Sequence, residues 1–288
     1  MTTQHYYGCG MEEFMYLEKI QSPEDVKKLD VEQLKVLAGE MRQALIQKLS
    51  VHGGHVGPNL GMVEATIAMH YVFDSPKDKM VFDVSHQSYC HKMLTGRADA
   101  FLDEAKYDDV SGYSERSESA HDFFCIGHTS TSVSLACGLA KARDLADENY
   151  NVIAVIGDGS LSGGEALEGL DFAKELNGNL IVVVNDNEMS IAENHGGLYE
   201  NLKLLRDTKG QAECNIFKAM GLNYVFVEDG NDLTQLIDVF KRVKDSKAPV
   251  AVHIHTLKGK GYTLAEENKE SWHWHMPFDI ETGKTKGN

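Results

Sequence analysis

The sequence is poor in basic residues and in long apolar runs. Of its 288 residues, 28 are Lys or Arg and 44 are Asp or Glu, which gives a formal net charge of −16. Nucleic acids are bound through clusters of Lys and Arg, and because no such cluster occurs, nucleic acid is disfavoured as a partner. The longest aliphatic runs, such as residues 180–184, are far too short to cross a bilayer, so no membrane association is expected.

Cysteine is also scarce. The five cysteines are Cys9, Cys90, Cys125, Cys137 and Cys214. Their number is odd, and they form no CxxC or metal-like spacing, which is typical of free thiols in a reducing cytosol. The first fourteen residues contain neither the basic nor the apolar region of a signal peptide, so we expect a cytoplasmic protein.

Short apolar segments alternate with helix-length segments through most of the chain. Segments of this kind predict an α/β fold: a parallel sheet of about five strands with helices on both faces. The predicted strands are residues 79–84, 152–156, 180–184, 224–227 and 250–255. The predicted helices are residues 30–49, which begin at a capping box of Asp30 and Gln33, then 60–73, 86–94, 131–146, 164–176, 212–220 and 233–243.

The pattern divides the chain into three parts. Residues 1–50 form an N-terminal helical segment, residues 51–265 the main α/β domain, and residues 266–288 a tail with weak structure. Glycine-rich residues 51–60 and the polar stretches 107–124 and 193–210 are expected to be loops, the two polar ones near a functional site. The acids of one of these loops, Glu115, Glu118 and Asp122, are expected to form a solvated face.

An acidic residue stands between two glycines where a buried strand is expected to end. Gly157, Asp158 and Gly159 follow the strand, and a helical pattern begins near Gly163. Ligands bind beyond the carboxyl ends of parallel strands, where glycine permits a sharp turn and a helix N-terminus attracts phosphate. Asp158 alone would repel phosphate, so we expect a divalent cation such as Mg²⁺ between the two.

The next predicted strand ends in Asn185, Asp186 and Asn187. From Ser160 to Asp186 there are 27 residues, which is enough for one helix and one strand. Neighbouring strand ends can therefore converge on one ion, and Asn187 is the second predicted ligand. A lone Gly-Asp-Gly is compatible with a plain strand-to-helix turn, but the whole unit is far more specific. A dinucleotide-binding protein is disfavoured because no GxGxxG follows the first strand.

These motifs resemble the thiamine-diphosphate signature of transketolase-like enzymes, and most closely the N-terminal third to half of the 1-deoxy-D-xylulose-5-phosphate synthase family. The similar segments run from about Ser22 to Glu266. They read SPEDVKKL, GGHVGPNLGMVEATIAMHYVFDSPKDKMVFDVSHQSYCHKMLTGR, GHTSTSVSLACGLAKARDL, VIGDGSLSGGEALEGL, VVNDNEMSIAEN and LKGKGYTLAE. The resemblance implies that residues 51–265 are the diphosphate-binding (PP) domain of this fold.

The resemblance implies a role for individual residues of the cofactor site. The Mg²⁺ ligands would be Asp158, Asn187 and the backbone carbonyl of Met189. The main chain of Gly159 and Ser160, beside Gly157, would bind the diphosphate. The further cofactor contacts would be Gly127, His128, Thr129, His86, Lys258 and Tyr262.

Histidines are implied in proton transfer at the reacting carbon. His55, His86 and His273 match the catalytic positions, although the residues around His273 differ from the family pattern. His91 also matches a family position and could be purely structural. The resemblance implies thiamine diphosphate and Mg²⁺ as cofactors, a transferase of aldehyde or ketone residues, and a place in isoprenoid biosynthesis.

Two departures from the family leave alternatives open. The activating glutamate of the family lies in a pyrimidine domain that this chain does not contain, so we expect a partner chain or a C-terminal half, commonly within a homodimer. The segment between Glu193 and Asn215 is shorter than in the synthases. The alternatives are therefore a synthase acting on pyruvate and glyceraldehyde 3-phosphate, a split transketolase acting on sugar phosphates, or a non-catalytic partner that retains the fold.

Overall fold

The computed structural model describes residues 14–176 and 178–287. Cys9 and most of the amino-terminal stretch considered above lie outside this range. The strands are β1 (Lys79–Phe82), β2 (Val152–Gly157), β3 (Ile181–Asp186), β4 (Asn223–Val227) and β5 (Val250–His255). Across the described residues they form one five-stranded sheet in the order β1-β2-β3-β5-β4, with every neighbouring pair parallel. The predicted sheet is confirmed.

The helices lie largely where periodicity predicts them. They are α1 (Pro23–Val26), α2 (Val31–His52), α3 (Gly57–Gly61), α4 (Val63–Val72), α5 (Tyr89–Lys92), α6 (Asp99–Leu102), α7 (Ser132–Leu145), α8 (Asp158–Leu161), α9 (Gly164–Ala173), α10 (Gly197–Asp207), α11 (Ile216–Ala219), α12 (Leu233–Val243) and α13 (Thr263–Glu267). Two 3₁₀ turns, Leu17–Lys19 and Glu104–Asp109, and a π-helical turn, Met93–Arg97, complete the set. The capping box of Asp30 and Gln33 begins α2 as predicted.

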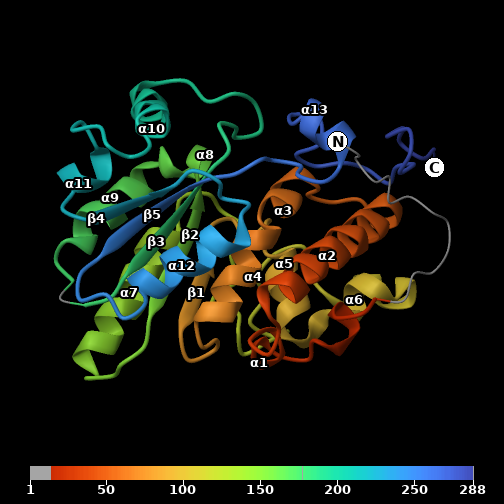
Figure 1. Cartoon of the computed structure of the whole chain (residues 1–288), viewed down its shortest axis with the longest axis horizontal. Coiled ribbons are helices and arrows are strands. Elements are labelled where there is room, and N and C mark those ends of the chain that lie inside the picture. The colour runs from red at the N-terminus through yellow and green to blue at the C-terminus, as the bar shows by residue number, and fades with distance from the viewer. Residues whose placement is uncertain (1–13, 177, 288) are drawn as a thin grey trace.

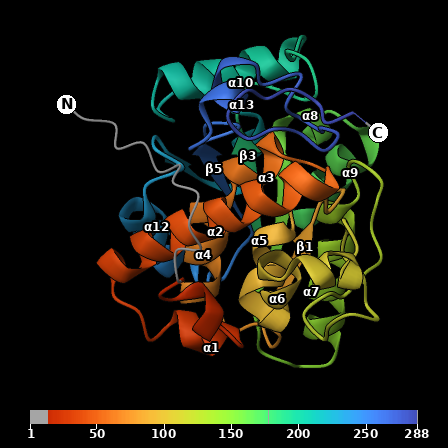
Figure 2. The same cartoon turned by 90° about the vertical axis from the view of Figure 1, so that its right-hand side faces the viewer.

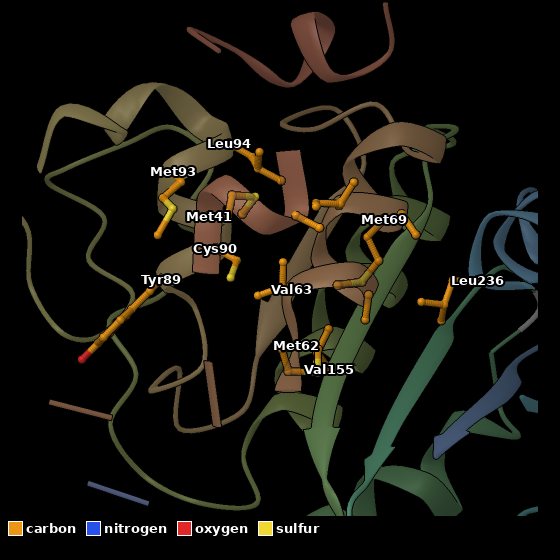
Figure 3. Close-up of a cluster of buried hydrophobic side chains, with 14 of the residues drawn as sticks. Met41, Met62, Val63, Met69, Tyr89, Cys90, Met93, Leu94, Val155 and Leu236 are labelled. Carbon is orange, nitrogen blue, oxygen red and sulfur yellow. The ribbon is translucent and has the colours of Figure 1, made fainter. Parts of the chain in front are cut away.

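Helices cover both faces of the sheet (Figures 1 and 2). Successive strand residues point to opposite faces, so Ile153 and Val155 pack toward α2, α4 and α12, whereas Ala154 and Ile156 pack toward α7 and α9. Several methionines fill the first of these cores, where Val155 and Leu236 also lie (Figure 3). Burial on both faces explains why the strands are apolar almost throughout.

Two predicted loops contain helices. Gly57–Gly61 forms α3 inside the predicted loop 51–60, with Pro58 in the first turn, where its missing N–H costs nothing. Gly197–Asp207 forms α10 inside the predicted loop 193–210. Both loop predictions are wrong because these helices are short or mostly polar, and packing against the rest of the protein stabilises them.

The C-terminal strap, defined as residues 271–287, is packed rather than weakly structured, which corrects the predicted tail. The backbone N–H of Phe278 donates to the Ser50 carbonyl at 2.9 Å, and the Phe278 side chain is fully buried. Trp272 packs between Phe278 and Tyr262, with ring-centroid distances of 4.8 and 5.0 Å. The strap has no helical or alternating pattern, so only its tertiary contacts reveal that it is ordered.

Replacing Phe278 with alanine therefore tests the strap. We expect Phe278→Ala to lower the free energy of unfolding by about 3–5 kcal/mol, because it leaves a cavity under the strap. The exposed neighbour Met276 provides the control, and Met276→Ala should change stability by less than about 0.5 kcal/mol. Urea unfolding followed by circular dichroism measures both, and equal effects would mean that the strap does not pack.

Candidate active site

Three histidines from distant parts of the sequence meet at the carboxyl end of the sheet. His55 follows α2, His86 follows β1, and His273 lies in the C-terminal strap. The ring centroids are 4.9 Å apart for His55 and His86, 5.6 Å for His55 and His273, and 5.4 Å for His86 and His273. The structure thus brings together the three histidines predicted to be catalytic.

One asparagine joins two of the histidine-bearing loops. The side-chain amide of Asn59 in α3 donates to the carbonyls of both His55 and His86 at 2.8 Å, and its oxygen accepts from the N–H of Tyr89 at 3.0 Å. Asn59 is fully buried, so these bonds satisfy a side chain that would otherwise be costly to desolvate. Sequence reasoning placed Asn59 only in a glycine-rich loop and missed this role.

The C-terminal strap positions His273, and a strained turn positions His86. Gly54 and His275 exchange two backbone hydrogen bonds of 2.9 Å, which fixes His273 beside His55. Before His86, Val84 and Ser85 have φ values of 56° and 67°, a region unfavourable for side chains with a Cβ. Backbone strain of this kind persists only where the surroundings enforce it, and it is often found at functional sites.

Burial makes the histidines neutral. It lowers the pKa of His55 and of His273 to about 4, and it lowers that of His86 well below 6.5, with nearby positive charge adding to the effect for His86 and His273. The Nδ1 atoms of His86 and His273 are buried without a hydrogen-bond partner in the described part of the chain. A ligand that reaches the cluster therefore meets neutral imidazoles with free ring nitrogens, which can accept or return a proton.

The Gly157-Asp158-Gly159 turn lies at the tip of β2, as predicted, and is closely packed. A Cβ on Gly159 would lie 2.6 Å from the Cβ of Ser190, and one on Gly163 would lie 1.9 Å from the Oγ of Ser130. The first contact joins the turn after β2 to the turn after β3. Glycine is required here because the two turns leave no room for a side chain.

Asp158 is buried beside a second carboxyl group. Its Oδ2 accepts from the Nδ2 of Asn194 at 2.9 Å. Burial, and then the neighbouring carboxyl of Asp186, raise the pKa of Asp158 well above its usual range, although the charge of Lys258 opposes this. Two adjacent buried carboxyl groups are a favourable place for a cation, because a cation removes both the repulsion and the desolvation cost.

Asp186 itself is turned toward α10 and β5. It is fully buried, accepts from the Nε2 of His253 at 2.8 Å and pairs with the Nη1 of Arg206. Burial opposes its ionisation, but His253 and Arg206 outweigh burial and lower its pKa to about 2. Sequence reasoning singled out Asn187 in this motif, and the role of Asp186 depends on partners that only the fold supplies.

The other predicted metal ligands lie in the turn after β3. Asn187 is buried, and its Oδ1 accepts from the N–H of Met189 at 3.2 Å across Glu188, whose φ is 68°. Nowhere in the described ranges do three or more His, Cys, Asp or Glu side chains form a metal-binding group. A cation here would thus need amide, carbonyl or phosphate oxygens besides Asp158, which is the ligand set that the sequence predicts and that Mg²⁺ commonly takes.

A cavity of about 1010 Å³ opens beside these turns. Asp158, Asp186 and Met189 line it, together with α10 and Glu266–Glu270. Figures 1 and 2 show α8, α10 and α13 gathered at this end of the sheet. Ligand access to the turns is therefore available from this side.

The predicted cofactor loop Gly127–Thr129 is exposed and lies next to the same turn. Asp83 at the tip of β1 is fully buried and accepts from the N–H groups of Ser130 and Ser132 at 2.8 and 2.9 Å. The Oγ of Ser130 donates to the Ser160 carbonyl at 2.7 Å, which ties the loop to the predicted phosphate turn. Cofactor contacts of Gly127, His128 and Thr129 stay a prediction, and Asp83 is a supporting residue that sequence reasoning missed.

Lys258 and Tyr262 occupy different surroundings. Lys258 is buried, its Nζ donates to the Ser190 carbonyl at 2.7 Å, and burial lowers its pKa to about 8. It thus lies against the turn after β3, where an anion could contact it. The Tyr262 hydroxyl donates to the Ile280 carbonyl at 2.8 Å, so this side chain packs the strap. Direct cofactor contact by Tyr262 stays a prediction.

Two of the three acids predicted to form a solvated face, Glu118 and Asp122, are instead held in ion pairs, whereas the Glu115 carboxylate accepts hydrogen bonds from Ser117 and Cys125. Asp122 is buried and pairs with the Nη1 and Nη2 atoms of Arg97 and with the Nε2 of His91. Glu118 accepts from Lys92 and Arg97. These acids therefore anchor the loop, which carries Tyr113 to within 5.9 Å of the His55 ring. His91 belongs to this buried network, in line with the structural alternative.

The fold and the polar strand tips define an α/β domain of the transketolase type. The transketolase of Campylobacter jejuni has a TM-score of 0.68 at 19% identity, covering 85% of this chain and 41% of that one. That of Leishmania mexicana has a TM-score of 0.65 at 20% identity, covering 86% and 39%. At these identities the likeness concerns the fold alone.

Sequence comparison identifies the family within this class. The family model described as 1-deoxy-D-xylulose-5-phosphate synthase matches residues 17–215 and 203–256. Synthases from Caldanaerobacter subterraneus and Listeria monocytogenes are each 44% identical over 94% of this chain, which corresponds to 49% and 46% of their own lengths. The chain belongs to the 1-deoxy-D-xylulose-5-phosphate synthase family and spans about half the length of the curated relatives it matches.

The histidine cluster predicts an unusual titration. In an NMR titration, the rings of His55 and His273 should stay neutral until the pH approaches 4, far below the ordinary value of about 6.5. Because these pKa values are lower in the folded state, their contribution to stability is complete above about pH 6.5 and is lost as the pH falls toward 4. A midpoint near 6.5 for either ring would show that the cluster is open to water.

Proposed function

We propose that this chain is the Mg²⁺- and thiamine-diphosphate-binding half of an enzyme of the 1-deoxy-D-xylulose-5-phosphate synthase type. The observation that carries the proposal is the link that Lys258 makes between the three neutral histidines and the turn after β3: its Nζ donates to the Ser190 carbonyl, and its charge acts on His86 and His273. A non-catalytic protein with this fold would need neither the buried pair of carboxyl groups, Asp158 and Asp186, nor the nearby histidines that can transfer protons. The reaction would break the bond between the carboxyl group and the carbonyl carbon of pyruvate, release CO2, and join the remaining two-carbon unit to glyceraldehyde 3-phosphate through a new C–C bond, as a step of isoprenoid biosynthesis.

Each part of the site would have a distinct task toward the cofactor. Asp158, Asn187 and the carbonyl of Met189 would bind the cation, while Lys258 and the main chain of Gly159 and Ser160 would face the diphosphate. Bound thiamine diphosphate supplies a carbanion source and an electron sink. Gly127, His128 and Thr129, in the loop bonded through Ser130 to the turn after β2, would make further contacts with the cofactor.

The histidines would handle protons at the reacting carbon. His55, His86 and His273 are buried and neutral, so each can accept a proton from a hydroxyl or donate one to a developing alkoxide. Their ring centroids lie 4.9 to 5.6 Å apart, which is the spacing of rings in contact, so the three side chains support one another's orientation. Positioning by Asn59 and by the strap would keep this geometry fixed before substrate arrives.

A pyrimidine domain would complete the enzyme. In the proposal, a second chain or a C-terminal half supplies the activating glutamate, and the assembly is a cytoplasmic homo-oligomer. No helix among the described residues is long and apolar enough to span a membrane. This chain matches 49% and 46% of the lengths of two curated relatives, so about half of each relative has no counterpart in this chain. This supports the proposal that a further domain or chain completes the enzyme.

A two-carbon ketol transfer between sugar phosphates is the second candidate reaction. The two matched ranges of the family model overlap at residues 203–215, inside the segment from Glu193 to Asn215 that is expected from the sequence to be short for a synthase. This segment includes the end of α10 and borders the cavity. The Listeria synthase aligns over 277 residues and the Caldanaerobacter synthase over 307, each for 94% of this chain, so synthases themselves differ in inserted length and the split transketolase is kept as the alternative to be decided by the substrate test.

Calorimetry tests cofactor binding directly. We expect thiamine diphosphate to bind in the presence of Mg²⁺ and to bind far more weakly when EDTA replaces it. Asp158→Asn should weaken binding by roughly 10–100-fold, because a charge-assisted interaction is lost. Asp171→Asn on the exposed face of α9 makes the same chemical change elsewhere and should leave affinity unaltered. Metal-independent binding of equal strength would contradict the proposal.

Activity measurements test the need for a second part. The purified chain alone should show little turnover of pyruvate with glyceraldehyde 3-phosphate, or of sugar phosphates. Adding a pyrimidine-domain chain should restore turnover, and the substrate pair that reacts identifies the synthase or the transketolase alternative. Substantial ketol transfer by the chain alone would show that no partner is required.

A further inference from the structure

Helix α10 contacts both turns that carry the predicted metal ligands. Tyr199 and Arg206 are seven residues apart, which is close to two helical turns, so they project from one side of the helix. Leu202 and Leu205 between them are buried in the core beneath α10. Apolar contacts therefore hold the helix on the domain, and the side chains of Tyr199 and Arg206 reach the turns at the edge of the sheet.

Arg206 fixes the turn after β3. Its Nη1 pairs with the Oδ2 of Asp186, and its Nη2 donates to the Oε2 of Glu188 at 3.2 Å. The same Asp186 oxygen accepts from His253, whose Nδ1 lies 2.8 Å from the hydroxyl of Tyr224. Asp186 is thus bound from two sides, and changing its orientation would break a buried ion pair, which is strongly unfavourable.

Tyr199 fixes the turn after β2. Its hydroxyl donates to the carbonyl of Gly159 at 3.3 Å. Just before the helix, Asn194 donates to the Oδ2 of Asp158 at 2.9 Å. One continuous segment, residues 194–206, therefore contacts the turns at the tips of β2 and β3, although the sequence predicts a loop over these residues.

We infer that Tyr199 and Arg206 are positioning residues that hold the two turns of the cation site at a fixed separation, and we call the pair the α10 clamp. The inference rests on the proposed function for the identity of the ligand. The two turns approach one another closely at Gly159 and Ser190, and Glu188 in the turn after β3 is in the left-handed region, so contacts from α10 restrict how the turns can move relative to one another. By holding the turns in place in advance, the clamp reduces the cost of ordering the site when Mg²⁺ and a diphosphate bind.

The principal test compares Arg206→Gln with Lys209→Gln. Both variants remove one positive charge, but Lys209 follows α10 and pairs with exposed Glu228 at 2.8 Å, away from the turns. Without ligand, Arg206→Gln should speed hydrogen exchange of the amides of residues 188–190 by about tenfold or more, and Lys209→Gln should not. The Mg²⁺ concentration that half-saturates thiamine diphosphate binding should rise about tenfold in Arg206→Gln and change less than about twofold in the control.

Milder variants keep the inference testable if Arg206→Gln does not fold. Arg206→Lys keeps the charge but cannot reach Asp186 and Glu188 together, so its Mg²⁺ requirement should lie between those of the parent chain and Arg206→Gln. Tyr199→Phe should speed exchange in residues 159–161 and leave residues 188–190 unchanged. If α10 contributed only general stability, each variant would speed hydrogen exchange in both turns rather than in one of them.

The outcomes separate the clamp from the proposed function. If the parent chain binds no thiamine diphosphate but the two exchange effects appear, the clamp stands and the proposed cofactor is wrong. If the parent chain binds and the Arg206 and Tyr199 variants bind equally well with unchanged exchange, the clamp is wrong. A lower unfolding midpoint with an unaltered Mg²⁺ requirement would also overturn it.

Discussion

Two buried carboxyl groups at neighbouring strand tips are the constraint on which the site depends. Asp158 and Asp186 lie next to one another where water cannot screen them, so the protein must neutralise or separate them. For Asp186 the protein supplies this stabilisation through Arg206 and His253. Asp158 lacks such a strong partner, since Asn194 is neutral and Lys258 acts from further away. The asymmetry makes Asp158 the side chain that a cation would stabilise most.

Parallel topology explains why so many polar groups meet at this edge. All five strands end on the same side, so the residues that follow each strand form one continuous rim. Asp83 and His86 follow β1, the Gly-Asp-Gly turn follows β2, and Lys258 follows β5. The C-terminal strap adds His273 from outside the sheet. Distant segments therefore build one site at the rim of the sheet.

The accuracy of the sequence predictions follows the type of signal. Apolar strands such as Val250–His255 and periodic helices such as Leu233–Val243 were located to within a few residues. Burial imposes an order of apolar and polar residues that can be seen along the sequence. The strap and α10 were missed because their order depends on contacts with residues remote in the chain. Glu118 and Asp122 were misjudged for a similar reason: a carboxyl group such as that of Asp122 is buried only where a guanidinium from elsewhere in the chain pairs with it.

The sequence alone determined the class of fold, the family, and the residue types available at each strand tip. Local patterns carry this information, since periodicity reports which faces are buried and glycines report where the backbone must turn. The tertiary structure decided which of those residues meet. It placed three histidines within about 5 Å of one another, turned Asp186 toward Arg206, and used Asn59 to join two loops. These are pairings across long chain separations, and they depend on distances that no local pattern encodes.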